Sequence, residues 1–181
     1  MRVIAGHFRG TKLHSPPGED IRPTADRLRE SIFNIIGPRI RGKHVLDLFA
    51  GTGAMGIEAL SRGAHHAVFI DKNPQALNLI QRNVAKVRAA ENATVIAWDI
   101  RRDLNCLKNL AVPEIIFIDP PYRQGLIQSA LANLKEIQIP FHLVVVEHDP
   151  REPLENRPAG LDIVDQRRYG KTLVSFLNGV V

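Results

Sequence analysis

The chain has 181 residues, 44% of them hydrophobic and 24% charged, which is enough for one domain with a full core and too little for a second catalytic domain. It has a single cysteine, Cys106, no Cys or His pair at metal-ligand spacing, no signal peptide and no long apolar run. We therefore expect a cytoplasmic protein without disulfides, bound metal or membrane association.

The net charge of +5 is unevenly distributed. Residues 1–43 hold nine Lys and Arg against four Asp and Glu, whereas residues 44–181 hold fifteen of each. A basic segment on a neutral body favours a polyanionic partner, and a solvated basic surface is the alternative.

The first 14 residues carry two short β-prone runs around Gly6 and Gly10, which predict a small hairpin. Its cations Arg2, Arg9 and Lys12 are expected to point outward. A connection rich in Pro and Gly follows, and Thr24 is a candidate N-cap for a helix that ends near Ile36. We place the boundary between this extension (1–21) and the main domain (22–181) in the connection.

The segment VLDLFAGTGAMGIE, residues 45–58, reads as a strand, a tight turn and a helix. Gly51 and Gly53 allow a sharp turn and let bare backbone approach a ligand, and the N–H groups that open the helix offer donors to a polar or anionic group. The glycines match the dinucleotide fingerprint G-x-G-x-x-G, which is weak by itself but gains weight from the strand before it and the helix after it. The segment predicts a nucleotide-like cofactor, with a plain strand-to-helix turn as the alternative.

Two acids accompany this loop. Asp71 ends the next apolar run, 20 positions after Gly51, where a carboxylate can accept hydrogen bonds from both hydroxyls of a ribose. Asp47 lies inside the first apolar run, so its charge must be paired or act on a ligand. It either caps the N–H groups of the loop or lies near a cationic cofactor such as a sulfonium.

The remaining elements alternate between strand and helix. Asn73 and Pro74 start a helix, and strands are expected at 94–98, 115–118 and 143–146, with a helix from about 124 to 135 between the last two. Asp99, directly after the third strand, could accept from an adenine amino group, and a helix N-cap is its plain alternative. This order predicts a doubly wound, mostly parallel sheet of the Rossmann-like class, seven strands in all, closed by an antiparallel hairpin at 161–177.

The turn after the fourth strand reads Asp119-Pro120-Pro121-Tyr122. Both prolines lack an N–H, so the turn presents a carboxylate and carbonyls without competing donors. If Asp119 and the carbonyl of Pro120 hold the two hydrogens of an exocyclic amine, the nitrogen lone pair can be directed at a methyl group on sulfur. Tyr122 offers a face on which a base can stack, which requires only its ring. A rigid turn with a capping Asp is the alternative.

These features together resemble class I S-adenosylmethionine-dependent methyltransferases, and the chain as a whole resembles the RsmD-type family. That family methylates N2 of a guanine in bacterial 16S ribosomal RNA. The resemblance rests on RVIAGHFRGTKL at the start, RPTADRLRESIFN at 22–34, DLFAGTGAMGIEALSRGA at 47–64, and DPPY. Lys171 departs from the pattern, because relatives often have an acid there.

The resemblance implies the following assignments. S-adenosylmethionine would be bound by Asp47, Phe49, Gly51, Gly53, Asp71 and Asp99. The target base would be held by Asp119, Pro120, Pro121 and Tyr122. The uneven charge, rather than the resemblance, places the RNA contacts at Arg2, Arg9 and Lys12. Arg22 is a further candidate that could border the active site, with a Pro-rich turn as its plain alternative. The partner would be 16S ribosomal RNA or an assembling small subunit, and a monomer that needs no metal is expected.

Other functions remain open. An NAD-dependent oxidoreductase would explain the glycines and Asp71, but the chain shows no Tyr-Lys or His pair for it and DPPY would stay unexplained. An adenine-N6 methyltransferase needs a target-recognition region, for which 181 residues leave little room. Protein-glutamine methyltransferases usually carry Asn-Pro-Pro, whereas this chain has Asp119 before the two prolines. A non-catalytic RNA-binding module would not need the whole set of cofactor residues.

Overall fold

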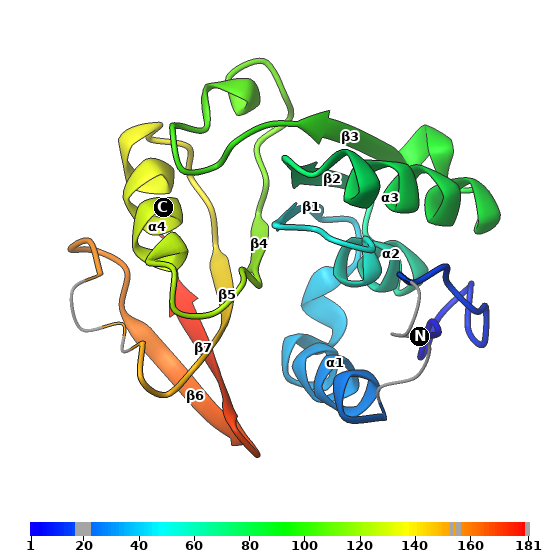
Figure 1. Cartoon of the computed structure of the whole chain (residues 1–181), viewed down its shortest axis with the longest axis horizontal. Coiled ribbons are helices and arrows are strands. Elements are labelled where there is room, and N and C mark those ends of the chain that lie inside the picture. The colour runs from blue at the N-terminus through cyan, green and yellow to red at the C-terminus, as the bar shows by residue number, and fades with distance from the viewer. Residues whose placement is uncertain (17–22, 153, 155–156, 180–181) are drawn as a thin grey trace.

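One seven-stranded sheet organises the computed structural model, which describes residues 1–16, 23–152, 154 and 157–179 (Figure 1). The strand order is β3-β2-β1-β4-β5-β7-β6. The first five strands pair in parallel, and β7 pairs antiparallel with both β5 and β6. The strands are β1 (His44–Leu48), β2 (His66–Asp71), β3 (Ala93–Ala97), β4 (Ile115–Ile118), β5 (Leu143–His148), β6 (Ile163–Tyr169) and β7 (Thr172–Asn178).

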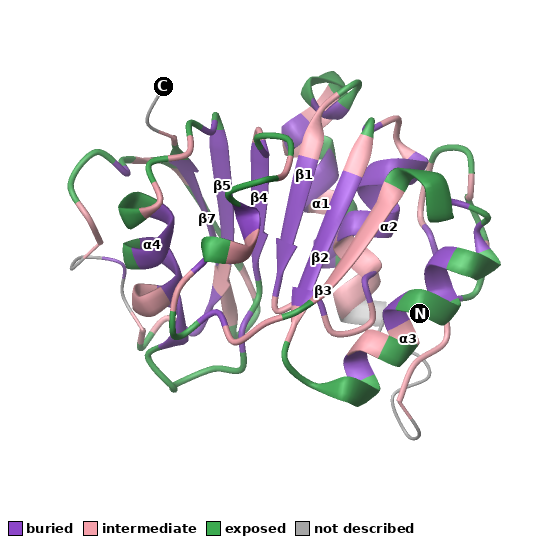
Figure 2. Cartoon of the chain, turned by 90° about the horizontal axis from the view of Figure 1, so that it is seen from above, coloured by how far each residue is buried: buried purple, intermediate pink, exposed green. Residues whose placement is uncertain are grey.

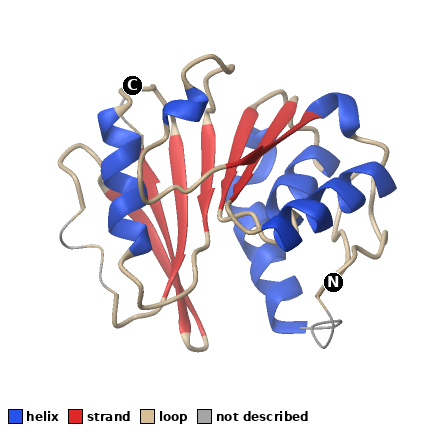
Figure 3. Ribbon diagram, turned by 45° about the horizontal axis from the view of Figure 1, so that its top comes forward, coloured by secondary structure: helices blue, strands red, loops and turns tan. Residues whose placement is uncertain are grey.

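Helices cover both faces of the sheet (Figure 3). The α-helices are α1 (Pro23–Ile36), α2 (Ala54–Ser61), α3 (Pro74–Lys86) and α4 (Leu126–Glu136), and short 3₁₀ helices are η1 (Gly37–Ile40), η2 (Ala90–Asn92) and η3 (Asn105–Leu107). On one face, α1, α2 and α3 pack on Phe69, Phe117 and Val145. On the other, α4 and the segment around η3 pack on the alternate residues of the same strands. The predicted doubly wound sheet with its closing hairpin is confirmed.

Burial follows the position of each strand. The central strands β1, β4 and β5 are almost fully buried, because both of their faces are covered, whereas the edge strand β3 is only partly buried (Figure 2). The apolar runs without alternation that predicted these central strands are what parallel strands covered on both faces require.

Two local expectations need correction. Helix α1 begins at Pro23, so Thr24 lies inside the helix and is not its N-cap. No helix follows Asp99, whose carboxylate instead accepts the N–H of Arg101 in a turn. The predicted amino-terminal hairpin is present but short: Arg2 and Lys12 form an antiparallel bridge, and the N–H groups of Val3 and Leu13 donate to the carbonyls of Thr11 and Met1. Asn73 also caps α3 as predicted, accepting the N–H of Gln75.

The amino-terminal extension is fastened to the body by buried polar side chains. Glu58 of α2 is fully buried and accepts the N–H groups of Ile4 (2.7 Å) and Ala5 (3.0 Å). Ser61, one helical turn further along, accepts the N–H of Phe8. Because these buried acceptors need donors, the extension is an integral part of the fold from its first residues. Arg22 and the boundary at 21/22 lie outside the described residues.

Candidate active site

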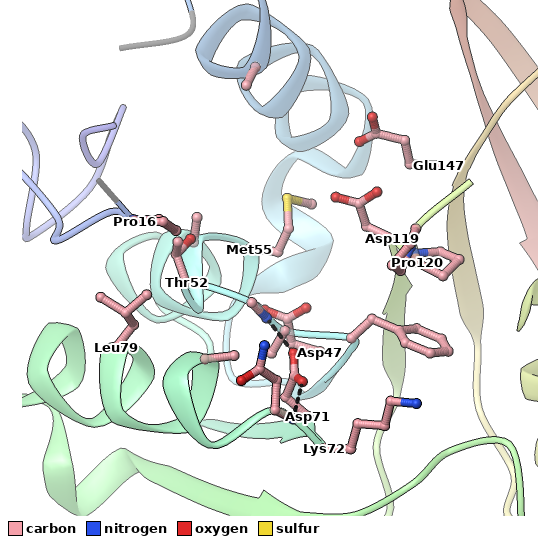
Figure 4. A pocket seen from close by; sticks show the side chains of 18 of the residues that line it. Pro16, Asp47, Thr52, Met55, Asp71, Lys72, Leu79, Asp119, Pro120 and Glu147 are labelled. Atoms are coloured by element: carbon pink, nitrogen blue, oxygen red, sulfur yellow. Dashed lines mark hydrogen bonds between the residues drawn. The ribbon is translucent and has the colours of Figure 1, made fainter. Parts of the chain in front are cut away.

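A large cleft opens at the carboxyl ends of the parallel strands (Figure 4). Its volume of about 1570 Å³ exceeds the ~300–1,000 Å³ of an ordinary small-ligand pocket, so it has room for a cofactor and part of a second molecule. Its wall contains every described candidate for cofactor or base binding except Gly53, which lies directly beside it: Asp47, Phe49, Gly51, Asp71, Asp99, Asp119, Pro120, Pro121 and Tyr122.

Strand register places three carboxylates in a row along this cleft. Asp47 is level with Phe69 and Phe117, and Phe117 is level with Val145. Two residues beyond Phe69, Phe117 and Val145 come Asp71, Asp119 and Glu147. Side chains two residues apart in a strand share a face, and neighbouring strands are about 4.8 Å apart. Asp119 and Glu147 therefore lie on adjacent strands, and Asp71 lies on the far side of β1.

Every second residue of the loop after β1 has a left-handed backbone conformation. Phe49, Gly51 and Gly53 have φ values of 61°, 56° and 77°. A Cβ on Gly51 would have one neighbour within 4 Å, the carbonyl oxygen of Phe49 at 3.9 Å, so a ligand can approach this backbone closely. At Gly56 a Cβ would lie 2.3 Å from the ring of Phe69, so the third glycine of the motif serves the packing of α2 on β2.

Asp47 joins β1 to the start of α2. Its side chain is buried, with 2% of the residue exposed, and it accepts the N–H of Gly56 at 2.9 Å. Burial raises the pKa of Asp47 to about 7; the hydrogen bond from Gly56 opposes this rise and the charge of Asp71 adds to it. Of the two sequence alternatives, the capping contact is present, and the carboxyl group also lines the cleft.

Asp71 is anchored by its neighbours. One carboxyl oxygen accepts the N–H of Gly51 (3.0 Å) and the other accepts the N–H of Asn73 (2.8 Å). Each oxygen of a carboxylate has a second acceptor position, so these contacts orient the group and leave it able to bind hydroxyls.

Asp99 lies in the cleft wall but is already paired. The guanidinium of Arg101 donates to both of its oxygens, at 2.6 Å and 3.0 Å, and Lys72 lies 4.0 Å away. The hydrogen bonds from Arg101 hold the pKa of Asp99 well below its ordinary value. A ligand amine would share this carboxylate with Arg101 or displace that side chain, which is exposed.

The turn from Asp119 to Tyr122 is fixed at its far end. Arg123 has a left-handed φ of 59°, and its N–H donates to Glu152 at 2.6 Å. Its guanidinium donates to Asp149, which is 5% exposed. Both acids follow β5, so the loop after that strand holds the turn in place.

Tyr122 is fixed through its hydroxyl group. The hydroxyl donates to Oε1 of Glu147 at 2.9 Å and lies 3.1 Å from the hydroxyl of Thr172. The residue is still 39% exposed and lines the cleft. These contacts preorganise a stacking surface.

Asp119 and Glu147 both extend into the cleft (Figure 4). The enclosing protein raises the pKa of Asp119 well above its ordinary value, and the charges of Glu147 and Asp47 raise it further. Asp119 remains exposed to the space of the cleft, so water there moderates the effect of burial. Burial likewise raises the pKa of Glu147, while the hydrogen bond from Tyr122 opposes that rise.

Sequence reasoning assigned no role to Glu147, Thr172 or Arg101, which all line the cleft. The signal for Glu147 was present, because it follows an apolar strand just as Asp71 and Asp119 do. The positions of Thr172 and Arg101 depend on how the hairpin and the turn after β3 fold back, which no local pattern encodes.

The RNA-contact candidates Arg2, Arg9 and Lys12 lie on the amino-terminal extension, and all three are exposed. Arg2 lies 3.8 Å from Asp26 of α1. The extension reaches the cleft, because Met1 and Ser15 line its wall.

The described part of the chain lacks two further kinds of feature. No helix in it combines the length and apolar character needed to cross a membrane. It also contains no group of three or more His, Cys, Asp or Glu residues that could hold a metal ion.

Known proteins match nearly the whole chain. A family model described as "Conserved hypothetical protein 95" matches residues 1–178. YlbH of Bacillus subtilis, provisionally named an rRNA methyltransferase, is 37% identical over 97% of each chain. Ribosomal RNA small subunit methyltransferase D of Haemophilus influenzae is 35% identical over 85% of this chain and 81% of its own.

The fold agrees with these relatives. The solved structure of the Escherichia coli protein YhhF, provisionally named a methyltransferase, superposes with a TM-score of 0.84 and 32% identity over 99% of this chain and 97% of its own. Ribosomal RNA small subunit methyltransferase D of Escherichia coli K12 is 38% identical over 75% of this chain and 67% of its own. The chain belongs to the family described as conserved hypothetical protein 95, the RsmD-type methyltransferases.

Proposed function

We propose that this protein transfers a methyl group from S-adenosylmethionine to the exocyclic N2 amine of a guanine in small-subunit ribosomal RNA. The observation that carries the proposal is that one cleft contains both the ribose-binding candidate Asp71 and the amine-binding turn at Asp119, which follow the two strands on either side of β1. The names of the relatives support the substrate class, and the choice of N2 rests on the resemblance to the RsmD-type family.

The residues of the cleft fit this cofactor. Asp71 would hold the ribose, Asp99 the adenine amine, and the backbone at Phe49, Gly51 and Gly53 would lie against the nucleoside. When bound, the cofactor supplies an electrophilic methyl group on a positively charged sulfur. The carboxyl group of Asp47, in its ionised form, would oppose that charge, and a bound sulfonium would favour the ionised form.

The same observations disfavour NAD. A dinucleotide needs the N–H groups at the start of α2 for its pyrophosphate. One of these, Gly56 N–H, already donates to the carboxylate of Asp47, and the row of acids would repel two phosphates.

The turn would prepare the target amine. Asp119 and the carbonyl of Pro120 would accept its two hydrogens, which directs the nitrogen lone pair and stabilises the positive charge that develops during transfer. Tyr122 would stack on the flipped base, a contact worth ~1–3 kcal/mol in related complexes. The basic extension (1–21) would bind RNA, residues 22–181 would carry the catalytic site, and the protein would act as a monomer.

Labelled S-adenosylmethionine, incubated separately with naked 16S ribosomal RNA and with small-subunit particles, tests the proposal. Nucleoside analysis should find the label in N2-methylguanosine, and the Asp119→Ala protein should label the RNA more slowly, by about 10²-fold or more. Label in N6-methyladenosine would show that the target base is adenine. If neither the naked RNA nor the particles become labelled, the proposal is wrong.

A further inference from the structure

We propose that Glu147 selects guanine as the target base by accepting the hydrogen bond of its N1–H group. This inference rests on the proposed function and adds to it a residue that determines base specificity. The relevant edge of guanine carries the N2 amine and, directly beside it, the N1–H. A carboxylate next to the amine-binding group therefore meets a donor.

The sheet places Glu147 where that donor would lie. Val146 is level with Ile118, so Glu147 and Asp119 occupy equivalent positions on adjacent parallel strands, about 4.8 Å apart. On its other side, Asp119 is level with Phe49 in the loop after β1, which has no side-chain acceptor and lies on the proposed cofactor side. The N1 side of the base must therefore lie over β5.

The position of Tyr122 favours the same orientation of the target base, with its N1 side toward Glu147. Its hydroxyl donates to Oε1 of Glu147, so a base stacked on the Tyr122 ring has its edge near that carboxylate. Among the described residues no hydrogen bond is recorded to Oε2 of Glu147, which leaves this oxygen for a ligand. Burial raises the pKa of Glu147, and the hydrogen bond donated by Tyr122 opposes that rise, so this contact favours the ionised form, which can only accept.

Adenine would be rejected by the same arrangement. Its N6 amine could donate to Asp119, but the ring nitrogen beside that amine, N1, carries a lone pair and no hydrogen. That lone pair would face an ionised carboxylate, and both groups would be left without a donor. A site built to hydrogen-bond a ligand N–H discriminates strongly against an analogue that lacks it.

The test uses Glu147→Gln, which keeps the size of the side chain and an acceptor for Tyr122 but can present an amide N–H to the base. The substrate is the RNA or particle labelled in the experiment above, with the mapped guanine left in place or replaced by 2,6-diaminopurine. This analogue keeps the N2 amine and has an acceptor at N1. Glu136→Gln is the matched control, because Glu136 is exposed at the end of α4, outside the cleft.

The wild type and Glu136→Gln should prefer guanine over diaminopurine by about 10²-fold or more in kcat/KM. Glu147→Gln should lose about 10²-fold on guanine, gain on diaminopurine and bind S-adenosylmethionine as the wild type does. A variant that retains the wild-type preference for guanine would overturn the inference, as would one that is inactive on both bases with cofactor binding intact. If the wild type labels no guanine, the proposed function itself fails.

Discussion

Asp47 accepts the backbone N–H of Gly56 at 2.9 Å, so a carboxyl group from the centre of the sheet occupies the start of the helix that follows the glycine loop. Because this contact holds an ionisable group inside the fold, the stability of the protein depends on whether Asp47 is charged. The ring of Phe69 packs closely against Gly56, which leaves this end of α2 little freedom to move.

The first prediction concerns stability and pH. The pKa of Asp47 rises from 3.8 to about 7 on folding, so between these values the folded protein binds more protons than the unfolded chain, and the free energy of unfolding falls as pH rises. Asp47→Asn keeps an acceptor for Gly56 and has no charge to bury. Above pH 7 it should be more stable than the wild type by up to about 4 kcal/mol, because each pH unit between the two pKa values contributes about 1.4 kcal/mol.

Urea denaturation without cofactor at pH 4.5, 6 and 8 measures this difference. The two proteins should have similar stabilities at the lowest pH and diverge as pH rises. Curves that run parallel over the whole range would show that Asp47 is not the group responsible.

The second prediction concerns the cofactor. Asp71→Asn should weaken S-adenosylmethionine binding about 10-fold or more, because charge-assisted hydrogen bonds to the ribose become neutral ones. Asp103→Asn is the control, since Asp103 also accepts a backbone N–H in a turn but does not line the cleft. Titration calorimetry with S-adenosylmethionine and NAD should show this loss in the first variant only, and no binding of NAD. Tight binding of NAD, or equal affinities in both variants, would refute the assignment.

The third prediction separates chemistry from binding. Asp119→Ala should lower turnover by about 10²-fold or more, the scale of one lost preorganised contact to a transition state. Its affinity for S-adenosylmethionine should stay near that of the wild type, because Asp71 and the glycine loop are untouched. Single-turnover methylation and calorimetry measure the two quantities. Near-normal turnover would mean that Asp119 does not hold the amine.

The fourth prediction revises an expectation from sequence. Stacking needs only a ring, which makes Tyr122→Phe a mild change, yet the structure shows the hydroxyl bound to Glu147 and Thr172. Tyr122→Phe should therefore lower kcat/KM for RNA about 10-fold, the scale of one lost hydrogen bond to a charged group. Thr172→Val should cost less, because the bond between Tyr122 and Glu147 remains. If the kinetics of the Phe variant equal those of the wild type, the hydroxyl has no role in RNA methylation and Tyr122 acts through its ring alone.

The fifth prediction concerns RNA binding. Changing Arg2, Arg9 and Lys12 together to Gln removes charge but leaves in place the backbone contacts to Glu58 and Ser61 that hold the extension. If each cation meets a phosphate, the slope of log affinity against log salt should shrink by roughly 2, at about 0.7 per contact for single strands. Filter binding over a salt series measures it, and cofactor affinity should not change. An unaltered slope would place the RNA elsewhere, first at Arg167 and Arg168 of β6.

The sequence alone determined the fold class and most of the wall of the cleft. Buried parallel strands need continuous apolar runs, and a polar residue directly after such a run must lie at the carboxyl edge of the sheet, so Asp71, Asp99 and Asp119 could be placed from local pattern. The proline pair likewise displays its acceptors whatever surrounds it.

Only the tertiary structure decided how these groups are paired and ordered. Strand order follows from the packing of helices on both faces, and it alone puts Glu147 next to Asp119 and separates both from Asp71. The contact of Tyr122 with Glu147 and Thr172 joins residues 25 and 50 positions apart. Such contacts depend on where distant segments come together in space, a global property of the packed chain that no local run of residues carries.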